Sequence, residues 1–294
     1  MSRPVLFTGA GVALVTPMNR DGSVNYEKYR ELIDYQIENN TDAIISVGTT
    51  GEAPTLEDTE HLRAFKVAIE QTNGRVPMIA GTGSNNTDHC IYMSREAKAM
   101  GADGLLLVTP YYNKTSQRGL IAHYSKIAAA VDLPIILYNV PSRTGVNLQP
   151  KTVIELSKIP NIVALKQASS NFSETAEIAA SCDITLYSGN DDQIVPLLSL
   201  GGKGVISVLS NVLPQQTHDI CQAWFDGDPT RALELQLHYL ELANALFMDV
   251  NPIPVKEAMN QLGMDVGDCR LPLYNMTDAM KARMTEVLKR YQLL

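Results

Sequence analysis

Short, continuously apolar runs rich in Val, Ile and Leu recur along the first three quarters of the chain, and each is followed by a polar loop and a longer segment of helical period. Because these runs do not alternate between apolar and polar residues, they predict strands buried on both faces, as in a parallel sheet covered by helices. There are eight such runs: Val12–Val15, Ala43–Val47, Met78–Ala80, Gly104–Val108, Pro134–Tyr138, Ile162–Leu165, Ile184–Tyr187 and Gly204–Val208.

The order of these elements predicts an α/β fold. Eight strand–helix units fit residues 1–227, and a TIM-type (β/α)8 barrel accommodates that number while leaving the sheet without exposed edges. An open, doubly wound parallel sheet is the alternative. Beyond residue 227 the strand signal ends, and we expect a C-terminal three-helix extension over residues 228–294. Its predicted helices lie near residues 230–247, 253–262 and 276–291.

Composition and charge narrow the class of protein. The 294 residues include 19 glycines and 15 prolines, close to average usage, which indicates a globular chain. A net charge of −8 disfavours nucleic acid and anionic membranes as partners. The N-terminal apolar stretch Val5–Phe7 is too short for a signal peptide, and no apolar run approaches membrane-spanning length. Four cysteines without a CxxC pair fit a reducing compartment, so we expect a cytoplasmic protein.

In a parallel barrel the active site lies at the C-terminal ends of the strands, which makes Lys166 the most informative residue. It directly follows the apolar run Ile162–Leu165. A low dielectric there lowers the pKa of the amine and favours the neutral form, which attacks a carbonyl to form a Schiff base. The alternative is a lysine paired with a carboxylate. Tyr138 ends the preceding predicted strand and is a candidate proton shuttle, although a buried tyrosine with a satisfied hydroxyl is the more common interpretation of the position alone.

Other candidate groups follow neighbouring strands. Gly48-Thr-Thr-Gly51 offers hydroxyl and N–H groups that can hold a carboxylate, although the bare pattern is weak. Arg143 stands in a predicted loop and can grip a second carboxylate, or else is an ordinary surface arginine. Asp191 and Asp192 are expected to cap the next helix. The exposed pair Tyr111-Tyr112 indicates either a subunit interface or packing on the chain's own helices. The five histidines show no metal-ligand spacing, and we assign no metal.

Taken together, three motifs resemble a known superfamily. Gly48-Thr-Thr-Gly-Glu52, Tyr138-Asn-Val-Pro-Ser-Arg-Thr-Gly145 and Leu165-Lys166 are similar to those of the dihydrodipicolinate synthase and N-acetylneuraminate lyase superfamily of class I aldolases. The resemblance covers essentially the whole chain, including the C-terminal helices. Arg143 and the run Val108-Thr-Pro-Tyr-Tyr-Asn113 resemble the synthase branch, because the sialic-acid and keto-sugar aldolases usually lack that arginine.

The resemblance implies a role for each candidate. Lys166 would form an imine with pyruvate, whose carboxylate is held by Thr50. Tyr138 and Thr49 would move protons together with Tyr112, which comes from the neighbouring subunit of a tight dimer. Arg143 would bind the carboxylate of L-aspartate 4-semialdehyde, in lysine and diaminopimelate biosynthesis. The remaining implied substrate-binding positions are Gly189 and Ile206. No cofactor is needed, and a homo-oligomer is expected, a dimer or a tetramer built as a dimer of dimers.

The resemblance also implies an effector site at the dimer interface. Relatives that are inhibited by L-lysine bind it with residues that match Asn85, Tyr111 and His61. This chain departs from them at His89, where they have a glutamate, and at Asp58, where they have a histidine. We therefore expect weak or absent inhibition by lysine. A keto-sugar or N-acetylneuraminate aldolase stays an alternative function, and a non-catalytic pyruvate-binding barrel is the alternative of another class.

Overall fold

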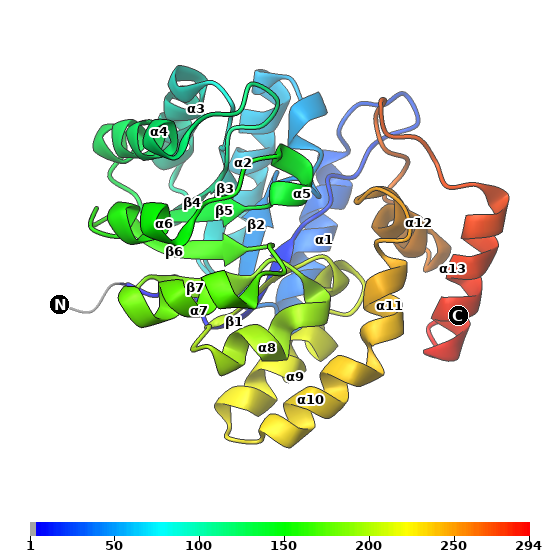
Figure 1. Cartoon of the computed structure of the whole chain (residues 1–294). Coiled ribbons are helices and arrows are strands. Elements are labelled where there is room, and N and C mark those ends of the chain that lie inside the picture. Colours follow the sequence, from blue (N-terminus) through cyan, green and yellow to red (C-terminus); the bar gives the residue numbers. More distant parts are fainter. Residues whose placement is uncertain (1–3) are drawn as a thin grey trace.

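The computed structural model describes residues 4–294 and shows eight parallel strands that close into a barrel in sequence order (Figure 1). The last strand pairs with the first, so the predicted (β/α)8 barrel is confirmed and the open doubly wound alternative is wrong. The strands are β1 Gly9–Ala13, β2 Ala43–Ser46, β3 Met78–Gly81, β4 Gly104–Val108, β5 Ile135–Asn139, β6 Ile162–Gln167, β7 Thr185–Ser188 and β8 Gly204–Ser207.

The first strand begins at Gly9, earlier in the chain than its apolar run predicts. The reason is that glycines pair where β1 meets β8 and closes the barrel. Gly204 has φ +148°, and a Cβ there would lie 1.8 Å from the carbonyl oxygen of Gly9. The two backbones therefore pair closely where β1 meets β8, in a stretch that hydrophobic periodicity does not detect. Residues 1–3 of the predicted barrel domain lie outside the described residues.

Helices surround the barrel and cover its outer face (Figure 1). Side-chain oxygens of Asn25, Asn86, Ser116 and Asn171 accept N–H groups of the first turn and start four of these helices. The helices of the barrel are α1 Tyr26–Glu38, α2 Asp58–Thr72, α3 Thr87–Met100, α4 Gln117–Ala130, α5 Pro141–Thr144, α6 Pro150–Leu156, α7 Phe172–Ser181, α8 Ile194–Ser199 and α9 Pro214–Phe225. Short 3-10 turns are η1 Ala53–Thr55, η2 Asp191–Gln193 and η3 Leu209–Asn211.

The hydrophobic core has two layers, one between the strands and the helices and one inside the barrel. Side chains alternate along a strand, so the interior position of Ala164 on β6 places Lys166, two residues later, on the same inward face. Phe7, which precedes β1, stacks on Tyr187 with 4.3 Å between ring centres, and the Tyr187 hydroxyl donates to the Phe7 carbonyl at 2.7 Å. These two rings therefore fill part of the barrel interior, and Tyr187 is the register partner of Lys166 on β7.

The C-terminal extension lies to one side of the barrel, as Figure 1 shows in yellow to red. The single helix predicted near residues 230–247 is divided into two helices that meet at Tyr239, and the other two predicted helices are present. Its helices are α10 Pro229–His238, α11 Leu240–Ala245, α12 Ile253–Gln261 and α13 Asp278–Arg290. Across residues 4–294, none of the helices has both the length and the apolar character that a membrane span requires.

Candidate active site

Lys166 and Tyr138 are register partners on adjacent strands, β6 and β5. The Nζ atom of Lys166 lies 4.3 Å from the centre of the Tyr138 ring, and both side chains are buried. The predicted neighbourhood of these two residues is confirmed. The strand continues two residues past the predicted end, so Lys166 is itself part of the β6 ladder and its side chain is held at a fixed height in the barrel.

Burial sets the protonation of the lysine. The low dielectric around Lys166 lowers the pKa of its amine to about 7, the positive charge of Arg143 lowers it further, and the negative charge of Asp191 opposes both effects. A lysine with this pKa is largely neutral at slightly alkaline pH. It therefore has the lone pair that a nucleophile needs.

Tyr138 is placed to exchange protons with the amine. Burial raises the pKa of its phenol, while the Arg143 charge and a hydrogen bond from Thr49 lower it in part. The phenol is consequently protonated at neutral pH and can donate its proton or pass one on. Thr49 follows β2 and Tyr138 lies on β5, so their two hydroxyl groups come from separate strands of the barrel.

The loop after β2 presents backbone donors. Val47 and Glu52 on either side of it have positive φ angles of 52° and 58°. Within residues 4–294, the backbone N–H groups of Thr49 and Thr50 donate to no backbone carbonyl. The hydroxyl of Thr16 donates to the Gly51 carbonyl at 2.7 Å and holds the loop from below. Free N–H groups beside two hydroxyls form a suitable anion site.

Arg143 lies on a one-turn helix, α5, and the predicted loop is wrong at this point. Pro141 starts the turn and Gly145 ends it in the left-handed conformation, which is the usual asymmetry of a helix start and stop. The exposed Arg143 donates from Nη2 to the backbone carbonyl of Asn251 at 3.2 Å. The side chain of Asn251 in turn donates from Nδ2 to Thr50 Oγ1 at 3.0 Å.

Asn251 is a residue of the site that sequence reasoning missed. It belongs to the extension, between α11 and α12. The two prolines of Asn251-Pro-Ile-Pro254 predict a break between helices, but no sequence pattern indicates that the break reaches the barrel mouth.

A buried ion pair fixes the extension to the loop after β2. Lys256 Nζ lies 2.9 Å from Glu52 Oε1, and both side chains are almost fully buried. Lys256 also donates to the carbonyls of Thr16 and Asp268, at 3.1 and 2.7 Å. The N–H of Arg270 donates to the second oxygen of Glu52 at 2.8 Å. Because both charges are paired and hydrogen-bonded, breaking either side would leave an uncompensated charge in the interior.

Asp191 does not cap a helix, and the predicted role of the Asp191-Asp192 pair is wrong, since α8 begins after Gln193. The Oδ2 atom of Asp191 instead accepts the N–H groups of Val208 and Leu209 at 3.0 and 2.9 Å. Burial raises the pKa of this carboxyl. Asp191 thus ties the ends of β7 and β8 together and places a carboxylate where it acts on Lys166.

The two remaining implied substrate positions are Gly189, which contacts the end of β6, and Ile206, which lies in the barrel interior. The N–H of Gly189 donates to the carbonyl of Gln167 at 2.8 Å, and a Cβ on Gly189 would lie 2.7 Å from the Ala168 Cβ. Ile206 is fully buried in the interior cluster that also holds Tyr138. Glycine is required at the first position because β6 and β7 approach closely there.

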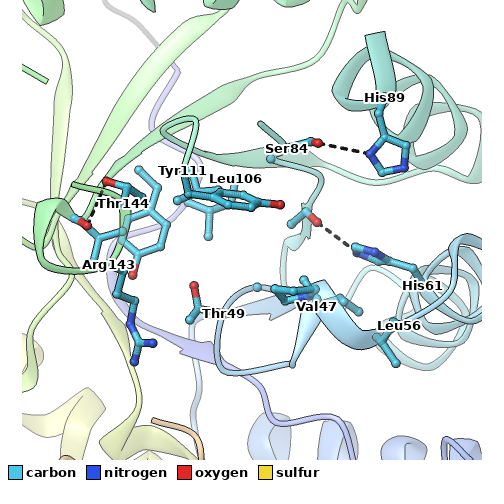
Figure 2. Close-up of a pocket in the computed structure, with 18 of the residues that line it drawn as sticks. Val47, Thr49, Leu56, His61, Ser84, His89, Leu106, Tyr111, Arg143 and Thr144 are labelled. Atoms are coloured by element: carbon cyan, nitrogen blue, oxygen red, sulfur yellow. Dashed lines mark hydrogen bonds between the residues drawn. The ribbon is translucent and has the colours of Figure 1, made fainter. Parts of the chain in front are cut away.

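A cavity of about 460 Å³ opens beside Thr49, Tyr138 and Arg143. Figure 2 shows Arg143 and Thr49 toward one side of it, His61 and His89 toward the other, and the ring of Tyr111 between the two groups. Tyr138, Thr49 and Arg143 therefore share one continuous space with most of the candidate effector residues, whereas Lys166 is not among the residues that line it.

Known proteins match this chain over nearly its full length. The Dihydrodipicolinate synthetase family matches residues 6–291. This chain belongs to that family. The 4-hydroxy-tetrahydrodipicolinate synthase of Caldicellulosiruptor saccharolyticus is 56% identical over 286 residues, which cover 97% of this chain and 96% of the relative.

Two solved structures of the family have the same fold. The chloride-inhibited dihydrodipicolinate synthase from Acinetobacter baumannii, complexed with pyruvate, is 41% identical with a TM-score of 0.95 and covers 98% of this chain and 99% of its own. The enzyme from Cyanidioschyzon merolae, with lysine bound, is also 41% identical, with a TM-score of 0.96, and covers 99% of this chain and 100% of its own.

The effector candidates make separate hydrogen bonds in this member of the dihydrodipicolinate synthetase family, and two pairs of them are bonded to each other. His89 Nε2 lies 2.9 Å from Asp58 Oδ1, and His89 Nδ1 lies 3.3 Å from Ser84 Oγ. His61 contacts the Gly81 carbonyl at 3.1 Å, and burial lowers its pKa to about 4, so this imidazole is neutral at neutral pH. Asn85 does not line the cavity, and its Nδ2 donates to the Tyr111 carbonyl at 3.1 Å.

Tyr112 is set apart from the other candidates of this family member. Its side chain is 92% exposed, and its backbone has a positive φ of 67°, which is uncommon for a bulky residue. One chain alone does not bring Tyr112 into the site. A contribution from a neighbouring subunit stays a prediction.

Proposed function

We propose that Lys166 is the nucleophile of this chain, whose activity is that of a 4-hydroxy-tetrahydrodipicolinate synthase, a class I aldolase-type lyase. The reaction condenses pyruvate with L-aspartate 4-semialdehyde in lysine and diaminopimelate biosynthesis. The observation that carries the assignment is the buried amine of Lys166, with its pKa lowered to about 7, lying 4.3 Å over the ring of Tyr138.

The first half-reaction takes place on pyruvate. The free N–H groups and hydroxyl of the Thr49-Thr50 loop hold the pyruvate carboxylate, and Gly189 and Ile206 bound the same space. The Lys166 amine adds to the keto carbon to give a carbinolamine. Loss of water gives the imine, and loss of a methyl proton then gives the enamine. Pyruvate is the ligand of the Acinetobacter baumannii relative.

Protons enter and leave through hydroxyl groups. Tyr138 protonates the leaving hydroxyl of the carbinolamine, and Thr49 connects Tyr138 to the next group of the relay. We assign that next position to Tyr112 of a second copy of the chain, because Tyr112 projects from its own surface. The assignment requires a dimer, and we propose that two dimers pair into a homotetramer.

The second half-reaction takes place on the semialdehyde. Arg143, on the exposed turn α5, binds its carboxylate with the geometry of a guanidinium fork. The enamine carbon attacks the aldehyde and forms the new carbon–carbon bond. The substrate's own amine then displaces Lys166 from the imine carbon, which closes the ring and frees the enzyme.

No cofactor enters this sequence of steps, because the protonated imine is the electron sink. All four cysteines are free thiols, which is usual in a reducing compartment, so we place the enzyme in the cytoplasm. The keto-sugar or sialate aldolase alternative is disfavoured by Arg143, which occupies the position where such an enzyme needs hydroxyl-binding groups. The binding-barrel alternative is disfavoured because it needs no Tyr138 and Thr49 beside Lys166.

Covalent trapping tests the proposal. The protein is incubated with pyruvate, reduced with borohydride, and digested for mass spectrometry. We expect the reduced adduct on Lys166 and turnover of pyruvate with L-aspartate 4-semialdehyde, and Lys166→Ala should lose both while melting near the wild-type temperature. An adduct on another lysine, or none, contradicts the mechanism. Efficient cleavage of sialic acid or of a keto-deoxy sugar supports the rival aldolase function.

A further inference from the structure

The extension delivers one side chain to the substrate-binding loop of the barrel. Asn251 is 5% exposed and lies between α11 and α12. Its Nδ2 donates to Thr50 Oγ1 at 3.0 Å, and its backbone carbonyl accepts from Arg143 at 3.2 Å. One residue thus contacts both groups that are assigned to substrate carboxylates.

The direction of the hydrogen bond between Asn251 and Thr50 determines what the Thr50 hydroxyl can do. A threonine hydroxyl has a single proton and can accept as well as donate. The hydrogen bond that Asn251 makes to Thr50 uses Oγ1 as the acceptor, so the O–H proton of Thr50 is left to donate to a ligand. Without the amide donor, this hydroxyl is free to rotate or to donate to a protein acceptor.

The position of Asn251 is fixed from behind. Lys256, one turn into α12, is paired with Glu52 at 2.9 Å, and Glu52 lies two residues after Thr50. The extension and the loop after β2 are therefore held as one unit by a buried ion pair. The Oδ1 atom of Asn251 is buried and has no hydrogen-bond partner in the described part of the chain, although buried amide oxygens are usually paired. Burying this oxygen without a partner costs folding free energy. The presence of Asn251 is therefore better explained by the hydrogen bond that its Nδ2 donates to Thr50 than by a contribution to stability.

We propose that Asn251 is a positioning residue for pyruvate. Its side-chain amide directs the hydroxyl proton of Thr50 toward the pyruvate carboxylate. This inference rests on the proposed function and adds to it a specificity residue from outside the barrel. The amide acts through Thr50, whereas the contact with Arg143 is made by backbone and survives any substitution of the side chain.

Two substitutions test the amide. Asn251→Asp keeps the shape but replaces the donor by an acceptor, which turns the Thr50 hydroxyl away from pyruvate and places a negative charge near its carboxylate. We expect the KM for pyruvate to rise about tenfold or more. Asn251→Ala should raise the KM for pyruvate by less. If thermal melting shows that the buried aspartate of Asn251→Asp prevents folding, the Asn251→Ala variant alone tests the amide. In both variants the KM for the semialdehyde should change by less than about twofold, because Arg143 keeps its partner.

A double-mutant cycle separates positioning from a general structural role. Thr50→Val removes the hydroxyl through which Asn251 acts. Adding Asn251→Ala to Thr50→Val should raise the KM for pyruvate by less than about twofold, because coupled residues are not additive. Asn244→Asp is the matched control, since Asn244 is exposed on α11 of the same extension, and it should behave as wild type.

Failure of this inference is distinguishable from failure of the proposed function. A wild-type protein that traps no pyruvate on Lys166 contradicts the proposed function. A wild-type protein that traps pyruvate, with folded Asn251 variants whose KM for pyruvate is unchanged, overturns the role of Asn251 alone. Additive effects of Asn251→Ala and Thr50→Val also overturn it, because they show that Asn251 does not act through the hydroxyl.

Discussion

The Nζ atom of Lys166 lies 4.3 Å from the centre of the Tyr138 ring, at partnered positions of β6 and β5. The face of an aromatic ring attracts a cation, yet burial dominates here, because the pKa of Lys166 is lowered to about 7. The ring contact therefore does not keep the amine charged, and under the proposed mechanism it places the phenol beside the nucleophile.

The lowered pKa predicts how adduct formation depends on pH. Below pH 7 the amine of Lys166 is protonated and unreactive, so the second-order rate of trapping pyruvate should rise with pH and level off above a midpoint near 7. Asp191→Asn should move the midpoint to lower pH, because the carboxylate favours the charged amine. A midpoint that stays near the ordinary lysine value, or moves upward in Asp191→Asn, contradicts this assignment.

The second-substrate role of Arg143 predicts a selective loss. Arg143→Ala should lower kcat/KM for L-aspartate 4-semialdehyde about thirtyfold, equivalent to about 2 kcal/mol, because a charge-assisted contact with a carboxylate is removed. Trapping of pyruvate should persist. It must be measured above pH 8, since the Arg143 charge also lowers the pKa of Lys166 and its loss raises that pKa. Arg118→Ala on the exposed face of α4 is the control. Equal loss of pyruvate trapping at that pH would place Arg143 on the first substrate.

Local patterns were sufficient to predict the barrel and the pairing of Lys166 with Tyr138. Consecutive strands of a barrel are neighbours, so residues at two successive strand ends must lie side by side. Strand order does not place Asn251, which is 201 residues from Thr50 in the sequence. It contacts Thr50 only because the C-terminal extension folds back to the barrel mouth. Strand order fails for Asp191 as well, because a carboxylate before a helical run has the appearance of a cap, and only the structure shows that its Oδ2 accepts the N–H groups of Val208 and Leu209 after β8. The boundary of the domains between residues 227 and 228 stays a prediction.

The exposed Tyr112 predicts sharing of the site between two subunits. If Tyr112 acts in the neighbouring site, Lys166→Ala and Tyr112→Phe chains that are mixed and reassembled should regain activity, because each hybrid dimer contains one site with both residues intact. The measurement is activity against the sum of the separate variants, with hybrid formation shown by native mass spectrometry. Hybrids that are no more active than this sum place Tyr112 outside the partner's site.

The pairing of His89 with Asp58 predicts weak inhibition by L-lysine. A lysine ammonium needs a desolvated counter-ion, and the loss of that counter-ion weakens the binding free energy by about 2 to 5 kcal/mol. Such a loss raises a submillimolar Kd for lysine to the order of tens of millimolar. By the resemblance to the family, His89 is expected to stand where the inhibited relatives have that acid. The carboxylate of Asp58, the nearest replacement, is bonded to His89 Nε2 at 2.9 Å and is half exposed to solvent, so it is neither free nor desolvated.

Titration of L-lysine in steady-state assays checks this expectation. Inhibition should be slight up to several millimolar. His89→Glu should introduce inhibition in that range, because it restores an acid beside the neutral His61, whose pKa is lowered to about 4. His238→Glu, an exposed exchange of the same residue types on α10, controls for the added charge and should leave the titration unchanged. Strong inhibition of the wild type at millimolar lysine would mean that the carboxylate of Asp58 leaves His89 and binds the ammonium, and would contradict the prediction.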